Sequence, residues 1–277
     1  MIFISLDQVP LMKGIVKALI RSHLFLSTCS FVFLFGLYHE YENSFIYSFM
    51  ISMGIIGVYN GHRLWKLNKG RLPDTMHNWT LLNKNPIFIL TIISTLSAVM
   101  LYFIFFSGNI LRDVLTVICV VISVFYVKRF GRFSLREIPY MKVFFVIFIW
   151  YLLFFIFPFM IFKVSQPWIL SFLLLLIILI PSDIKDVYFD NEKMRTIPQV
   201  IGLYRSVILI QLLIAVSIFI LFFQRDEIQN ALAWLLGFCY FFSMTLVFKK
   251  IGYKYFFVFA DFIFMIIGTA SVFLKCL

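Results

Sequence analysis

The sequence predicts an all-α integral membrane protein with nine transmembrane helices in a single domain, residues 1–277. Hydrophobic residues make up 62% of the chain, charged residues only 13%, and the mean hydropathy is +1.00. Soluble domains have about 45–50% apolar residues. A charge at the centre of a bilayer costs about 2.5–3.5 kcal/mol on insertion scales. This composition therefore predicts helices that face lipid.

Nine apolar runs have about the length needed to cross a membrane. A hydrocarbon core of about 30 Å needs about 20 helical residues. We expect the first run to be a retained helix and not a cleaved signal, because it is long and carries Arg21 and His23 near its start. Each of the four cysteines lies alone in an apolar run, which predicts buried thiols. The runs cover residues 16–37, 44–61, 86–106, 112–128, 143–162, 167–184, 205–223, 230–248 and 254–275.

The basic residues predict an N-terminus in the cytoplasm. The formal net charge is +11, and 20 of the 24 Lys and Arg residues fall on one side when the runs alternate across the membrane. This is the positive-inside pattern. It explains the excess charge without nucleic acid as a partner, because the basic residues lie between apolar runs and form no continuous exposed face. The residues on the other side are Arg112, Lys163, Arg225 and Lys275.

Three carboxylates follow the sixth run, at the start of a long polar inner loop. Asp183, Asp186 and Asp190 are spaced i, i+3 and i+7, so they share one face if the helix continues. Like charges this close repel unless a cation lies between them, and Mg²⁺ binds carboxylate oxygens together with waters and substrate phosphates. Lys193 and Arg195 can then hold the anionic end of a substrate. The alternative is a solvated, charged loop.

Residues 181–202 resemble the second aspartate-rich motif of the UbiA superfamily of membrane prenyltransferases. That motif is Asp-x-x-Asp-x-x-x-Asp, followed by a basic residue, Thr, Leu or Ile, and Pro. The three aspartates fall on its acidic positions, and Arg-Thr-Ile-Pro at 195–198 with Gly202 falls on its tail. The spacing from Asp190 to Thr196 is slightly shorter than in the family, and a glycine often found there is missing. The resemblance also covers the nine-helix layout.

The stretch equivalent to the first motif of the family has lost its acids. That motif, roughly Asn-Asp-x-x-Asp-x-x-x-Asp, ends the second helix and binds a second magnesium together with the diphosphate. Asn60 matches it, whereas its acidic positions correspond to Gly61, Leu64 and Asn68. The stretch has gained Arg63 and Lys66 instead. This departure puts ordinary two-magnesium ionisation of an isoprenyl diphosphate in question.

Two physical outcomes follow from placing cations where the family has anions. The guanidinium of Arg63 can bind phosphate oxygens directly in place of a metal, or the site no longer performs diphosphate chemistry. The alternative is that His62, Arg63 and Lys66 form only a positive anchor at an inner helix end.

A weaker signal, residues 126–132, resembles the Tyr-x-x-x-Lys-Arg region after the fourth helix of the family, with Lys128 as a candidate phosphate ligand.

The resemblance implies nine helices around a central cavity that opens to the cytoplasm, in a bacterial inner membrane. It implies transfer of a prenyl group from an isoprenyl diphosphate to an acceptor, with Mg²⁺ as cofactor and membrane lipids as the surroundings. The implied catalytic and metal-binding residues are Asp183, Asp186 and Asp190, and the implied substrate-binding residues are Asn60, Arg63, Lys128, Lys193 and Arg195.

Two other classes of function remain open. The first is a relative that binds an isoprenoid or lipid phosphate without ionising it, which the loss of acids from the first motif favours. The second is a transporter. It is less compatible with the sequence, because no pair of Gly- or Pro-broken apolar segments is visible and the polar groups cluster at one end of the helices.

Overall fold

The computed structural model is helical, and no strand occurs in the residues it describes: 10–70, 72, 74–127, 135–164, 167–188, 190, 194–223, 228–253 and 256–276. In lipid, backbone groups find no water, so their hydrogen bonds must close within each helix. The elements are α1 (Pro10–Arg21), α2 (Leu24–Tyr38), α3 (Ser44–Asn68), α4 (Asp74–Leu82), α5 (Lys84–Leu101), η2 (Tyr102–Phe106), α6 (Ile110–Val127), η3 (Leu135–Glu137), α7 (Lys142–Tyr151), η4 (Leu152–Ile156), α8 (Phe157–Phe162), α9 (Trp168–Asp186), α10 (Ile197–Ile201), α11 (Leu203–Phe223), α12 (Ile228–Leu246), α13 (Phe248–Ile251) and α14 (Phe256–Cys276).

Six helices in the described part of the chain are long and apolar enough to cross a membrane. A seventh span results if α1 and α2, which are bent by 68° relative to each other, are counted together. The two remaining apolar runs are occupied by α6 and α12. The helical membrane class is therefore confirmed, whereas the number nine stays a prediction. The six spans are Ser44–Asn68, Lys84–Phe106, Lys142–Phe162, Trp168–Asp186, Leu203–Phe223 and Phe256–Cys276.

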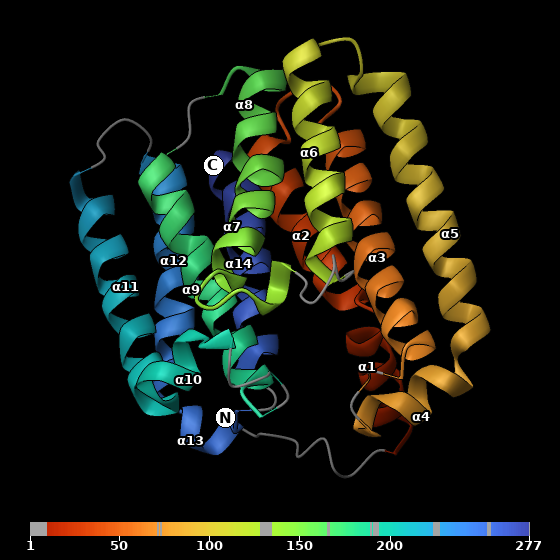
Figure 1. Ribbon diagram of the computed structural model, residues 1–277. Coiled ribbons are helices and arrows are strands. Elements are labelled where there is room, and N and C mark those ends of the chain that lie inside the picture. The colour runs from red at the N-terminus through yellow and green to blue at the C-terminus, as the bar shows by residue number, and fades with distance from the viewer. Residues whose placement is uncertain are drawn as a thin grey trace.

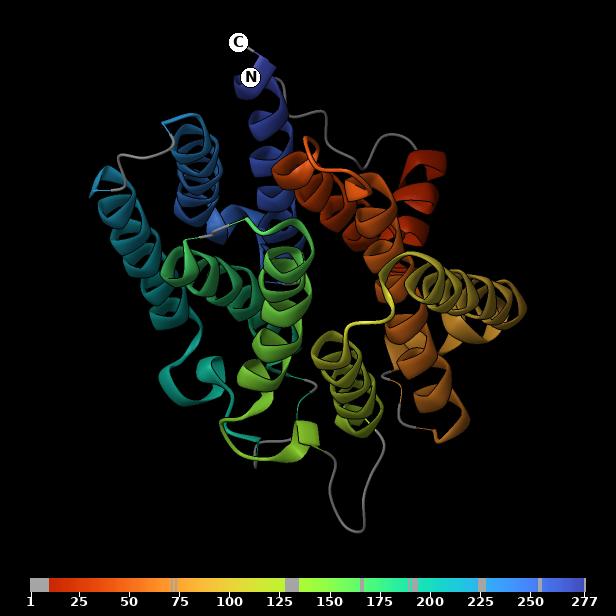
Figure 2. The same ribbon diagram turned by 90° about the horizontal axis from the view of Figure 1, so that it is seen from above.

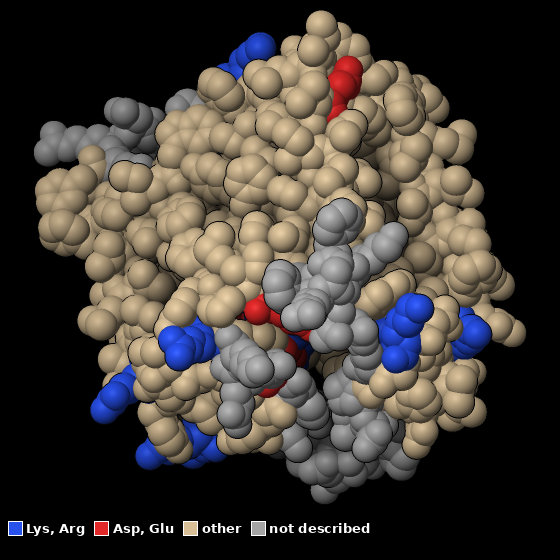
Figure 3. Space-filling model, in the orientation of Figure 1, with Lys and Arg blue, Asp and Glu red and all other residues tan. Residues whose placement is uncertain are grey.

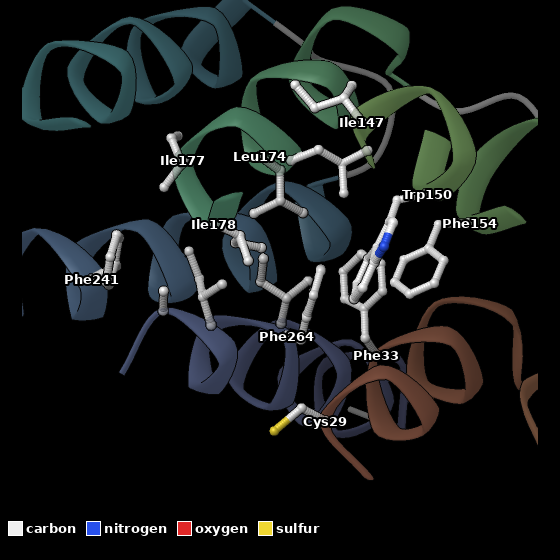
Figure 4. Packing of buried hydrophobic residues seen from close by; sticks show 14 of the residues in the cluster. Cys29, Phe33, Ile147, Trp150, Phe154, Leu174, Ile177, Ile178, Phe241 and Phe264 are labelled. Carbon is white, nitrogen blue, oxygen red and sulfur yellow. The ribbon is translucent and has the colours of Figure 1, made fainter. Parts of the chain in front are cut away.

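The long helices run side by side, with α2, α3 and α5 on one flank and α11 and α12 on the other (Figure 1 and Figure 2). The last helix, α14, packs against α2, α9 and α12, and α9 packs against α7 and α11. Aromatic rings fill the space between α2, α7 and α14 (Figure 4). The ring centroids of Phe33 and Phe264 are 4.7 Å apart, and Trp150 stacks on Phe264 at 5.8 Å. This core holds the first and last helices against the middle of the chain.

Glycine allows a close helix crossing between α2 and α14. A Cβ atom on Gly36 would lie 2.0 Å from the backbone oxygen of Gly268, and one on Gly268 would lie 2.2 Å from the oxygen of Val32. Real Cβ atoms do not approach backbone atoms so closely. Small residues at such crossings are the usual means of close helix packing within lipid.

Two tyrosine hydroxyls donate hydrogen bonds to backbone carbonyls that a local break in the helix from α7 to α8 leaves without a helical partner. Pro158 has no N–H to donate to the carbonyl of Phe154, four residues earlier, and the helix passes through the π-helical turn η4 at this point. The hydroxyl of Tyr38 donates to the oxygen of Phe154 at 2.9 Å, and the hydroxyl of Tyr47 donates to the oxygen of Leu153. Both carbonyls are therefore satisfied without water, as the interior of a bilayer requires.

Charged residues gather at one end of the helices. The short helices α1, α4, α10 and α13 all lie at the lower end in Figure 1. In the same orientation, most of the charged side chains visible on this face lie in its lower half, and few lie near the top (Figure 3). This separation agrees with the grouping of basic residues expected from the sequence. Which side of the membrane the charged end faces stays a prediction.

Candidate functional site

The C-terminal end of α9 brings three aspartates together. Asp183 and Asp186 lie in the last turn of the helix, three residues apart and therefore on the same side. The helix ends at Asp186, so it does not continue to Asp190 as the spacing argument required. A turn follows instead, in which the backbone N–H of Asp190 donates to the oxygen of Asp186 at 2.9 Å. This single helix-like bond keeps Asp190 next to the other two. We call these residues the acidic cluster.

Lys142, the first residue of α7, supplies a cation to the acidic cluster. Its ammonium nitrogen lies 2.7 Å from Asp183, 2.5 Å from Asp190 and 3.4 Å from Asp186. The Lys142 side chain is 8% exposed and those of Asp183 and Asp190 are 3% exposed, whereas Asp186 keeps 24%. An ammonium group has three N–H donors, and each has a carboxylate within reach. These contacts offset the cost of burying the charges.

Arg136 of η3 is the second cation at the acidic cluster. Its Nη2 atom lies 2.5 Å from Asp190 and 3.4 Å from Asp186. Burial disfavours the charged guanidinium, but Tyr126, Asp190 and Asp186 outweigh this effect and raise the pKa of Arg136 above its ordinary value. The ammonium of Lys185 lies 3.7 Å from Asp186. The acidic cluster is thus balanced by basic side chains of the chain itself.

These contacts determine how well the acidic cluster fits a magnesium ion. Mg²⁺ requires oxygen ligands in near-octahedral geometry at about 2.0–2.1 Å, and an ammonium in contact with all three carboxylates stands in the way. Oδ2 of Asp183 is the one acidic oxygen of the cluster that is buried without a hydrogen-bond partner in the described part of the chain. Among the same residues, no set of three or more His, Cys, Asp or Glu side chains is arranged to hold a metal ion. As its side chains lie, the acidic cluster does not fit the expected ion.

The Arg-Thr-Ile-Pro tail of the motif begins helix α10. The backbone N–H of Thr196 donates to Oε1 of Gln199 at 2.9 Å, which is part of a capping box. The side-chain nitrogen of Gln199 also donates to the backbone oxygen of Asp190 at 3.2 Å. The tail therefore fastens the acidic loop to the start of the next helix. The sequence interpretation missed this role, although Thr-x-x-Gln is a recognisable capping pattern.

Arg195 does not join the acidic cluster through any contact in the described residues. Its side chain is exposed, and Nη1 donates to the hydroxyl of Tyr140 at 3.2 Å. The guanidinium carbon lies 5.9 Å from the centre of the same ring. Lys128 and Lys193, two further expected phosphate ligands, lie outside the described residues. Arg136, which the sequence interpretation did not select, stands beside the acids, and nothing in its local sequence distinguishes it from other basic loop residues.

The C-terminal part of α3 carries two buried polar residues with unused hydrogen-bonding groups. Asn60 donates through Nδ2 to the backbone oxygen of Ser22 at 2.8 Å, and Arg63 donates through Nη2 to Nε2 of His23 at 3.0 Å. Oδ1 of Asn60 and Nη1 of Arg63 have no partner among the described residues. Arg63 is 8% exposed, and its guanidinium carbon lies 5.9 Å from the ring centre of Trp79.

No ion pair among the described residues includes Arg63. Arg21, another cation, acts on it electrostatically. His23, its hydrogen-bond partner, interacts electrostatically with His62 and Lys66. A buried charge without a counter-charge is costly. We call His23, Arg63 and Lys66 the basic cluster, and its arrangement is suited to an anion.

The basic cluster and the acidic cluster interact electrostatically. Lys66 of α3 interacts electrostatically with Asp186 and Asp190 and also with Arg136 and Lys142. Figure 3 shows acidic side chains set low on this face of the molecule, with basic side chains on both sides. An anion bound beside Arg63 and Lys66 would therefore also be attracted by the charges of Lys142 and Arg136.

No family model, no curated protein and no solved structure matches the chain. The fold and the site define a helical membrane protein with two charged clusters at one end of its helices: an acidic cluster that is paired with basic side chains, and a basic cluster whose Arg63 has no ion pair among the described residues.

Proposed function

We propose that the protein is a UbiA-like membrane prenyltransferase, which transfers a prenyl group from an isoprenyl diphosphate to an acceptor. The observation that carries this proposal is the buried guanidinium of Arg63, which has an unpartnered Nη1 atom and no ion pair among the described residues. A diphosphate supplies the missing anion. Its oxygens match the planar fork of an arginine, and Lys66 adds a second positive charge one turn away.

The same cations can assist the reaction. Negative charge grows on the departing diphosphate as its bond to the prenyl carbon breaks, and cations already in place stabilise that charge more than they stabilise the bound substrate. Aromatic side chains lead from the basic cluster into the helix bundle. The ring of Tyr59 lies 4.9 Å from that of His23, and its hydroxyl interacts with Trp150. Aromatic faces of this kind suit an isoprenoid tail and an allylic cation.

The proposal includes a topology. We place the charged end of the molecule and the N-terminus in the cytoplasm of a bacterial cell, with nine helices of the inner membrane around a central cavity. The gathering of Lys and Arg at one end supports this orientation. A reporter fused to the C-terminus tests it, because an odd number of spans puts that end outside. If a C-terminal reporter that works only in the cytoplasm is active, this result contradicts the nine-span arrangement.

Release of diphosphate tests the function. The purified protein in lipid nanodiscs is incubated with geranylgeranyl diphosphate and candidate acceptors, with Mg²⁺ or with EDTA, and inorganic diphosphate is measured. Arg63→Met should lower the rate at least about tenfold, equal to about 1.4 kcal/mol of transition-state stabilisation. The matched control is Arg112→Met, which removes a guanidinium at the opposite end of the molecule and should leave the rate unchanged.

A second candidate is a protein that binds an isoprenyl diphosphate without ionising it. The contacts of Lys142 with all three carboxylates favour it, because they leave no room for the metal used by enzymes of the family. Two results together support this candidate. The protein binds geranylgeranyl thiodiphosphate, which resists ionisation, and it releases no diphosphate from geranylgeranyl diphosphate. Absence of both binding and release contradicts both candidates.

A further inference from the structure

Lys142 has the contacts of a fixed counter-ion. Its nitrogen reaches all three members of the acidic cluster, at 2.7, 2.5 and 3.4 Å, and the side chain is 8% exposed. A substrate-binding lysine keeps at least one N–H donor free for its ligand. Here each of the three donors already faces a carboxylate.

The chain also fixes the position of Lys142 and Arg136. Lys142 begins α7, which packs along α9, the helix that carries Asp183 and Asp186. The backbone N–H of Tyr140 donates to the oxygen of Met194 at 2.9 Å, which ties the segment before α7 to the loop after α9. The two cations are therefore held at the acids by the fold itself. Together they carry the charge of one divalent ion.

We propose that Lys142 and Arg136 are built-in counter-ions that take the place of a divalent metal at the acidic cluster, so that anion binding at the basic cluster needs no metal. The second half of this statement rests on the proposed function, and the first half does not. The aspartates then act as positioning residues, which hold the two cations at a defined place beside Lys66. A metal could enter only by expelling a buried ammonium that is in contact with three carboxylates.

Titration with Mn²⁺ tests the first half without any substrate. Mn²⁺ shares the oxygen-ligand preference of Mg²⁺, and its electron paramagnetic resonance signal reports the free ion directly. The wild-type protein in nanodiscs of neutral lipid should leave the signal of Mn²⁺ unchanged at concentrations where metal enzymes are saturated. Saturable binding to the wild type that is lost in Asp183→Asn overturns the proposal.

Removing the ammonium should create the site that it occupies. Lys142→Met keeps the length and apolar stem of the side chain, and we expect its affinity for Mn²⁺ to exceed that of the wild type at least about tenfold, or about 1.4 kcal/mol. Lys249→Met is the matched control, because the Lys249 ammonium lies 5.4 Å from the ring centre of Tyr204 and no ion pair of the described residues joins it to the acidic cluster, so this variant should not change Mn²⁺ binding. A folded Lys142→Met protein with no gain in affinity overturns the proposal. If this variant does not fold, the Mn²⁺ titration of the wild-type protein decides whether the acidic cluster binds a metal.

Binding of geranylgeranyl thiodiphosphate tests the second half. We expect equal affinity in EDTA and in Mg²⁺, measured by calorimetry on the wild type, and weaker binding by Arg63→Met in both conditions. Binding that requires Mg²⁺ overturns the metal-independent mechanism. No binding in either condition overturns the proposed function, whereas the role of the counter-ions still stands or falls with the Mn²⁺ titration.

Discussion

The C-terminal ends of α9 and α3 interact electrostatically through Lys66, Asp186 and Asp190, yet their charges are handled in opposite ways. At α9, three carboxylates meet Lys142 and Arg136 at distances down to 2.5 Å. At α3, the guanidinium of Arg63 is buried against a neutral acceptor of His23, with one nitrogen unpartnered in the described residues. Charges that are paired within the chain contribute to its structure, and a buried charge left unpaired is available to a ligand. The following predictions test this difference.

The largest change in the free energy of unfolding is expected for substitution of Lys142. Lys142→Met leaves carboxylates buried without their main counter-ion, and breaking a buried pair in this way costs about 3–5 kcal/mol. Thermal unfolding of the purified protein in detergent measures the loss. Lys142→Arg, which restores the positive charge, should recover part of the stability. A loss below about 1 kcal/mol, the range of exposed ion pairs, would show that the acidic cluster is not held by Lys142.

A smaller change in the free energy of unfolding, of opposite sign, is expected for substitution of Arg63. An unpaired buried donor costs about 1–3 kcal/mol, so we expect Arg63→Met to raise the free energy of unfolding by about 1 kcal/mol while it weakens diphosphate binding. The combination of higher stability and lost function is typical of residues kept for their activity. Arg136→Met is the contrasting variant, because its loss should destabilise the protein. A fall in stability on replacing Arg63 would mean that this cation is paired.

The smallest effect is expected at Arg195, which the sequence placed at the substrate and the structure places on Tyr140. Arg195→Ala should change the free energy of unfolding by less than about 0.5 kcal/mol, as exposed substitutions usually do. Diphosphate binding should change little for the same reason. Strong loss of binding in this variant would restore the sequence prediction and would show that Arg195 turns toward the basic cluster when a ligand is present.

Several features of the fold could be predicted from local sequence. Hydropathy located a helix in each of the nine apolar runs, because the solvation of an apolar segment depends on its own residues. The break between α1 and α2 was not predicted. It occurs at His23, which has a left-handed backbone conformation with φ of 58°, and no glycine marks it.

The candidate site could be predicted only in part. The spacing of Asp183, Asp186 and Asp190 predicted their meeting, although a turn and not a continued helix brings the last of them close. Arg63 was selected as a candidate phosphate ligand, but its burial and its unpartnered nitrogen depend on α1, α2 and α4. Arg136 was missed altogether, because it lies 54 residues from Asp190 in the chain.

Sequence alone determined that this is a helical membrane protein with acids after one helix and bases after another, because hydropathy and charge order are properties of short segments. Tertiary structure alone decided which charges are neutralised. Lys142 and Asp190 are 48 residues apart and meet because α7 packs on α9. Coulomb energy depends on distance in space and on burial, and neither quantity can be obtained from the order of residues.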